Sequence, residues 1–175
     1  MAGFDKNLPQ DTLFEQAKQA YDNGDYNTAV QIYAFLAEQG HLPSQNSLGY
    51  CYDNGDGVEK DPEKAVYWYT KAAEQGDAKA QFYLGVCYYN GEGVEKDLKK
   101  AAYWYTQAAE QGDEDAQFNL ALCYDNGEGV EKDLEKAAYW YTQAAGQGYA
   151  KAQLNLALCY ENGEGVEKDL EMAAY

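Results

Sequence analysis

Apolar and polar positions alternate along the chain in a pattern that predicts pairs of amphipathic helices. The stretch 77–89 places its small and apolar residues on one side at helical spacing. These residues are Ala80, Leu84, Gly85, Cys87 and Tyr88. The stretch after Asp97 does the same with Ala101, Trp104, Tyr105, Ala108 and Ala109. Together the two stretches predict a helical hairpin.

Start and stop signals agree with this periodicity. Asn90 and Gly91 follow the first stretch, and both tolerate the left-handed conformation that ends helices. Asp97 is a good N-cap for the second helix. Gly112 then ends that helix, and Asp113 caps the next one. The loop between the helices contains one large apolar side chain, that of Val94, which we expect to anchor it.

The hairpin repeats along the chain. Cys51, Cys87, Cys123 and Cys159 lie 36 residues apart, and the sequence around them returns without a gap in four copies. A shorter copy precedes them, in which Tyr21 lies 31 residues before Tyr52. Hairpins of this kind bury their apolar faces by stacking on one another. We therefore predict a single repeat domain over 1–175, divided into 12–41, 42–76, 77–112, 113–148 and a shorter 149–175.

Sequence motifs that recur in the copies resemble a known repeat. Each full copy carries an LG or LA pair, a loop N-G-x-G-V-x-x-D and a second helix A-x-x-W-Y-x-x-A-A-x-Q-G. These motifs resemble the Sel-1-like repeat, a relative of the tetratricopeptide repeat, over residues 44–175, whereas 12–41 is more similar to a plain tetratricopeptide hairpin. The resemblance implies an all-α fold, a right-handed α-α superhelix of stacked hairpins. We expect Gly49, Gly85, Ala121 and Ala157 to allow close helix contacts, with tyrosines and tryptophans of the second helices filling the space between hairpins.

The amino-acid composition limits the classes of partner that this chain is expected to bind. The 175 residues carry a formal charge of −17, with lysine as the only strongly basic residue. Such a chain is repelled by phosphate backbones and anionic lipid, so we expect no nucleic-acid and no membrane partner. Apolar runs are far shorter than the ~20 residues that span a bilayer. The first ten residues lack the pattern of a secretion signal, so we expect a cytoplasmic protein.

The sequence gives little support for catalysis or for metal binding. One histidine, His41, and two serines, Ser44 and Ser47, argue against a Ser-His-Asp triad and a histidine metal site. The loop 125–133 differs from a calcium loop because glycine occupies its third and fifth places. His41 and Cys51 are ten residues apart on one expected helix, about 15 Å, too far for a dyad. We predict no enzyme activity, no metal and no cofactor.

The cysteines are expected to be buried free thiols. One cysteine per repeat places neighbours about 10 Å apart, beyond the reach of a disulfide. Some secreted, cysteine-rich relatives pair two cysteines per repeat, and this chain fills only the first-helix position. We therefore interpret the cysteines as small core residues in a reducing compartment.

The resemblance also suggests where a partner binds. In tetratricopeptide-like folds the first helices line a concave groove, and Asn119 and Asn155 match an asparagine whose amide holds an extended peptide. The acidic residues Asp53, Asp125 and Glu161 at the rim argue against a clamp for a C-terminal carboxylate. We expect a protein or peptide ligand with apolar anchors and basic flanks. The predicted partner-binding residues are Asn46, Tyr50, Lys79, Phe82, Tyr83, Val86, Tyr89, Phe118, Asn119, Leu122, Leu154, Asn155 and Leu158.

Several alternatives remain open at this point. Periodicity does not separate a groove from a core that closes over the same side chains. The acidic surface also fits a decoy that occupies a basic nucleic-acid-binding protein. Some relatives have been linked to weak β-lactam binding or hydrolysis, although this chain contains no Ser-x-x-Lys motif. The last hairpin, which stops early, could associate end to end with another copy, and the near-identical repeats also fit a recent duplication or a consensus design.

Overall fold

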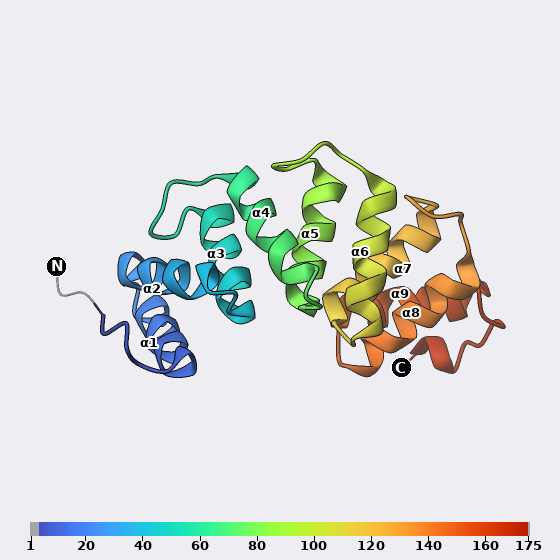
Figure 1. Ribbon diagram of the computed structural model, residues 1–175. Coiled ribbons are helices and arrows are strands. Elements are labelled where there is room, and N and C mark those ends of the chain that lie inside the picture. Colours follow the sequence, from blue (N-terminus) through green and yellow to red (C-terminus); the bar gives the residue numbers. More distant parts are fainter. Residues whose placement is uncertain (1–3, 175) are drawn as a thin grey trace. The chain divides into compact units, whose positions relative to one another are not determined.

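The computed structural model describes residues 4–174, and this part of the chain is built from α-helices and one short 3-10 helix (Figure 1). The helices are α1 (Gln10–Asp22), α2 (Tyr26–Glu38), α3 (Leu42–Asn54), α4 (Pro62–Ala73), α5 (Ala78–Asn90), α6 (Leu98–Glu110), α7 (Glu114–Asn126), α8 (Leu134–Gly146), α9 (Ala150–Asn162) and η1 (Met172–Ala174). No strand occurs between residues 4 and 174. The predicted series of helices is confirmed.

The chain divides into two compact units. The first contains the chain up to Ala80 together with residues 92–95, and the second contains 81–91 together with the chain from Lys96 onward. Within the first unit α3 packs on α4, and within the second α7 packs on α8. The prediction of one repeat domain with the boundaries given above stays a prediction.

Aspartate caps start the second helices, as predicted. Asp61, Asp97 and Asp133 each accept a hydrogen bond from the backbone N–H three residues later at 3.0 Å. Pro62 occupies the first position of α4, where its missing N–H costs nothing. Asp113 caps α7 in the same way, through the N–H of Ala116 at 2.9 Å. Side-chain caps of this type contribute about 1 kcal/mol each.

Tyrosines of the second helices fill the interior. Tyr69, Tyr105 and Tyr141 are at most 2% exposed. A Cβ atom added to Gly85 would lie 2.7 Å from the Tyr105 ring, so this glycine lets the ring lie directly on the α5 backbone. The equivalent position in α7 is Ala121, which is fully buried in one cluster with Tyr141. The expected role of the small residues is confirmed here, while the neighbouring tryptophans are half-buried.

Loops between the paired helices are fixed by close backbone contacts. Gly129 has φ +75° and lies against the first turn of α6, where a Cβ atom would overlap the carbonyl oxygen of Leu98. The Asp133 N–H donates to the carbonyl of Tyr124 at 2.9 Å and closes the loop. Glycine is required at position 129 both for its left-handed conformation and for this approach. The loop therefore ties one hairpin to the preceding one.

A glutamine pair joins the two helices of each complete hairpin. The bonds run from Nε2 to Oε1: Gln75 to Gln45 at 2.9 Å, Gln111 to Gln81 at 2.7 Å, and Gln147 to Gln117 at 2.9 Å. The acceptor glutamines are at most 5% exposed. Nε2 of Gln117 also donates to the carbonyl of Ala109 in the preceding hairpin at 3.2 Å. Each glutamine pair thus satisfies buried polar groups and fixes the stacking of hairpins.

Candidate partner-binding surface

The predicted apolar residues of α5 and α7 are half-buried in the second unit. The Phe82 ring lies 6.0 Å from the Tyr105 ring, and the Phe118 ring lies 5.1 Å from the ring of Tyr149. Val86 and Leu122 pack against the same clusters and keep part of their surface in solvent. These side chains therefore pack against the interior and also keep an accessible edge. Their exposure is intermediate between what a groove and what a closed core would give.

The two asparagines predicted to hold a peptide are partly exposed and locally engaged. Nδ2 of Asn119 donates to the carbonyl of Asp115, one turn earlier, at 2.7 Å. Asn155 hydrogen-bonds the Tyr141 hydroxyl, which also donates to Asp125 at 3.3 Å. Burial raises the pKa of Tyr141, and the Asn155 bond opposes this rise. Both amides are thus oriented by hydrogen bonds, Asn119 by its own helix and Asn155 by Tyr141 of α8.

Tyr83 and Tyr89 of α5 are also half-buried. The hydroxyl of Tyr89 donates to Oε2 of Glu128, in the loop after α7, at 2.8 Å. This bond to a carboxylate, followed by burial, raises the pKa of Tyr89. The Tyr83 ring lies 5.4 Å from that of Phe82. Tyr83 therefore packs beside Phe82, whereas Tyr89 is held by the loop after α7.

The two leucines of α9 are the most exposed of the predicted apolar residues. Leu154 is 63% exposed and Leu158 is 45% exposed. Their equivalents in α7, Phe118 and Leu122, are half-buried because they pack in one cluster with Tyr141 of α8 and Tyr149 before α9. The exposure of the two leucines therefore results from the position of α9, the last long helix of the described chain.

Three predicted residues lie in the first unit. Tyr50 is 37% exposed and its ring lies 6.5 Å from that of Tyr21. Lys79 is exposed. Oδ1 of Asn46 is buried and accepts no hydrogen bond within the described chain. At the predicted rim, burial raises the pKa of Asp53, an effect that Lys60 opposes and Glu92 reinforces.

All four cysteines are buried free thiols, as predicted. Burial raises the pKa of Cys51 and of Cys123 to about 12, and carboxylates at Asp56 and Glu128 add to the respective shifts. The two thiols therefore stay protonated at neutral pH, which is the less reactive form of cysteine.

The side chains of Ser44, His41 and Asp11 do lie in a row in the folded chain. Nδ1 of His41 lies 2.8 Å from Oγ of Ser44, and its Nε2 lies 3.8 Å from Asp11. Ser44 is 0% exposed, however, so no substrate reaches its hydroxyl. The contact joins His41, the residue before α3, to the first turn of that helix.

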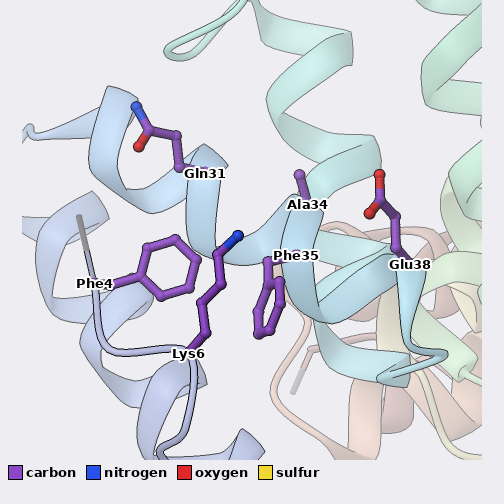
Figure 2. Close-up of a pocket in the computed structure, with 6 residues that line it drawn as sticks. All are labelled: Phe4, Lys6, Gln31, Ala34, Phe35 and Glu38. Atoms are coloured by element: carbon purple, nitrogen blue, oxygen red, sulfur yellow. The ribbon is translucent and has the colours of Figure 1, made fainter.

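A shallow hollow of about 440 Å³ lies on the first unit between the N-terminal segment and α2 (Figure 2). It is lined by Phe4, Lys6, Gln31, Ala34, Phe35 and Glu38. The ammonium group of Lys6 lies 5.9 Å from the Phe4 ring and 5.1 Å from the Phe35 ring. The chain's own lysine thus occupies the cation-π position that this hollow offers.

Sequence reasoning missed two repeated features. Tyr67, Tyr103 and Tyr139 on the second helices are 53–55% exposed, each in edge-to-face contact with the tryptophan that follows it. The glutamine pairs were not anticipated either. Recurrence at the 36-residue period was the available signal for both, because glutamine and tyrosine return at the same places in each copy.

These helices define an all-α repeat protein built from stacked hairpins. The Sel1 repeat pattern matches residues 42–77, 78–113, 114–149 and 150–175, and the chain belongs to the Sel1 repeat family. Proteins of this family generally act as protein-interaction scaffolds without catalytic activity. The predicted superhelical repeat fold and the Sel-1-like resemblance are confirmed.

Solved structures support this assignment. A protective antigen of uropathogenic Escherichia coli with the same repeat fold is 35% identical, with a TM-score of 0.89 over 94% of this chain and 36% of the antigen. A Sel1 repeat protein from Oxalobacter formigenes is 39% identical, with a TM-score of 0.86 over 91% of this chain and 66% of its own.

A curated relative matches a shorter stretch. An exopolysaccharide production negative regulator of Rhizobium leguminosarum bv. viciae is 42% identical over 53 residues, which is 30% of this chain and 20% of the regulator. The chain thus spans less than two thirds of each of these relatives. Among residues 4–174, no helix combines the length and apolar character needed to cross a bilayer.

Proposed function

We propose that the chain is a non-enzymatic adaptor that binds a peptide or protein segment along its first helices. The observation that carries the proposal is the placement of oriented amides beside partly exposed apolar side chains in the second unit. Asn119 lies next to Phe118 on α7, and Asn155 lies next to Leu154 on α9. An amide can bond to a peptide backbone while the apolar neighbour accepts a side chain.

The negative net charge of the chain favours a partner segment that is basic. The chain carries a formal charge of −17, and acidic residues lie on the same helices as the candidate surface, Asp115 and Asp125 on α7 and Glu161 on α9. A partner with lysine or arginine flanking its apolar anchors would gain association rate and selectivity from this field. The apolar anchors would supply most of the affinity, because exposed ion pairs contribute about 0–1 kcal/mol each.

The experiment is capture of partners from the source lysate on the immobilised chain. Asn119→Ala/Asn155→Ala is the test variant, and Asn126→Ala/Asn162→Ala is its matched control. The control asparagines end the same two helices and are exposed. We expect the test variant to lose a partner that the control retains. Equal capture by both variants would contradict the assignment of the surface.

Salt separates this proposal from the acidic decoy. A decoy that binds through charge loses its partner as salt rises, because screening shortens the range of exposed charges to about 3 Å at 1 M. A partner anchored by apolar contacts persists. Loss of the partner at high salt from all variants alike would favour the decoy.

A further inference from the structure

The hydroxyl group of Tyr141 connects a carboxylate of α7 to an amide of α9. It donates to Oδ2 of Asp125 at 3.3 Å and also bonds to the side chain of Asn155. A phenol has one hydrogen, and Asp125 accepts it, so the second bond is donated by Nδ2 of Asn155. The Oδ1 atoms of Asp125 and Asn155 are then acceptors that no donor of residues 4–174 satisfies. We call Asp125, Tyr141 and Asn155 the acceptor site.

The preceding repeat shows the same place with a donor of its own. Its equivalents, 36 residues earlier, are Tyr89, Tyr105 and Asn119. The hydroxyl of Tyr89 donates to Oε2 of Glu128 at 2.8 Å, so a neutral group of the chain already satisfies a carboxylate there. In the acceptor site Asp125 stands where this tyrosine would be. The difference between the two repeats therefore replaces a donor with an acceptor.

No cation of the chain neutralises the acceptor site. Within residues 4–174, no lysine forms an ion pair with Asp125. Burial raises the pKa of the Cys159 thiol, and the carboxylates of Asp125 and Glu164 raise it further. The negative charge of Asp125 therefore lies beside a buried part of α9 without a positive partner.

The acceptor site is accessible in the folded chain. Asp125 and Asn155 are half-buried. Asn119, the equivalent of Asn155 in α7, is half-buried as well, although α8 packs on α7. The second helix of a repeat therefore does not close this position, and a ligand can reach it from the solvent.

The acceptors favour an organic cation with several N–H groups. Among residues 4–174, no three His, Cys, Asp or Glu side chains are grouped so that they could hold a metal ion. A guanidinium group has five N–H donors in one plane, so it can bond to a carboxylate and to an amide oxygen at the same time. Leu122 and Leu158 lie three residues from Asp125 and Asn155, on the same helices, and offer apolar surface to the stem of an arginine.

We infer that the acceptor site binds the guanidinium group of an arginine in the partner segment. The inference rests on the proposed function and adds one named residue of the ligand to it. The guanidinium group donates to Oδ1 of Asp125 on α7 and to Oδ1 of Asn155 on α9. The arginine stem lies along Leu122 and Leu158.

The test is an NMR titration of the isotope-labelled full chain with the peptide acetyl-Leu-Arg-Leu-amide, followed through the side-chain amide signals of Asn155. Citrulline in place of arginine keeps the shape of the side chain and removes its charge. Lysine keeps the charge and removes the planar donor group. We expect saturable shifts with the arginine peptide, at least about tenfold weaker binding of the citrulline peptide, and intermediate binding of the lysine peptide.

Two matched variants locate the binding. Asp125→Asn and Glu114→Gln each remove one negative charge from α7. We expect Asp125→Asn to weaken binding of the arginine peptide at least about tenfold and Glu114→Gln to leave it unchanged. Asp125→Tyr copies the residue that the preceding repeat has at position 89, so it should fold and should abolish binding.

Equal affinity for the arginine and citrulline peptides would overturn the inference, as would the absence of saturable shifts or equal losses in Asp125→Asn and Glu114→Gln. Equal binding of the lysine and arginine peptides would overturn the assignment to a guanidinium group.

The inference and the proposed function can fail separately. A captured partner that Asn119→Ala/Asn155→Ala loses and Asp125→Tyr retains would overturn the inference and keep the proposed function. Arginine-dependent shifts at Asn155, together with partner capture that none of these variants changes, would support the guanidinium site and contradict the proposed function.

Discussion

The carboxamide of Gln147 donates to that of Gln117 at 2.9 Å and links α8 to the buried side of α7. Gln117→Ala removes this bond and the bond to Ala109, and it leaves a cavity. We expect the free energy of unfolding to fall by about 1–3 kcal/mol, measured by urea denaturation. Gln153→Ala at the exposed equivalent position is the control and should cost less than about 1 kcal/mol. Equal losses in the two variants would show that the glutamine pair does not stabilise the stacking.

Loop closure depends on Gly129. Gly129→Ala places a methyl group in a left-handed conformation and against the carbonyl of Leu98, so we expect a loss of about 2–4 kcal/mol. Gly148→Ala also has positive φ, +91°, but nothing lies within 4 Å of the added atom. It should cost only about 1 kcal/mol, the conformational part alone. Thermal unfolding of both variants measures the difference, and similar midpoints would argue against the close contact.

Cys159 is the most exposed of the four cysteines. Cys51 is 1% exposed and Cys123 is 2% exposed, whereas Cys159 is 8% exposed on the partly covered α9. We expect Cys159 to react first with a thiol reagent at pH 8, and the others to react only after unfolding. Mass spectrometry of the labelled chain identifies the order. Early modification of Cys123 would mean that α7 and α8 separate more readily than this packing implies.

Alkaline pH should destabilise the chain through its thiols. Burial raises the pKa of Cys123 from 9.0 to about 12 in the folded state. Between these values the unfolded chain loses the proton while the folded chain keeps it, so stability falls as pH rises. The slope contributed by one thiol is about 1.4 kcal/mol per pH unit. Cys123→Ala should reduce the slope of stability against pH above 9 by this amount, and an unchanged slope would contradict the burial effect.

Much of the fold could be predicted because each repeat carries its own signals. Asp97 and Gly91 mark helix boundaries through local hydrogen bonds and backbone conformation, which depend on few neighbours. The partner surface was harder to predict. Phe118 and Leu154 occupy equivalent positions with similar apolar character. Phe118 is half-buried because the rings of Tyr141 and Tyr149 pack against it, whereas Leu154 is 63% exposed. Periodicity reports which side of a helix is apolar, and it does not report what packs there.

The glutamine pairs illustrate a second limit. Gln81 and Gln111 are 30 residues apart, and a polar residue within a helical pattern is normally assigned to the solvent. For the equivalent Gln117, burial is favourable because its Oε1 accepts from Gln147 and its Nε2 donates to the carbonyl of Ala109. The burial of these glutamines depends on how the hairpins stack. The local sequence pattern does not contain this information.

The central claim, that the first helices of the second unit bind a segment with apolar anchors, is tested most directly by one affinity measurement. The captured partner is titrated against the wild-type chain, Asn119→Ala/Asn155→Ala and Asn126→Ala/Asn162→Ala at 0.1 and 1 M salt. We predict at least about a tenfold loss for the first double variant at both salt concentrations, and wild-type affinity for the second. Affinity that both variants retain and that high salt removes would contradict the account.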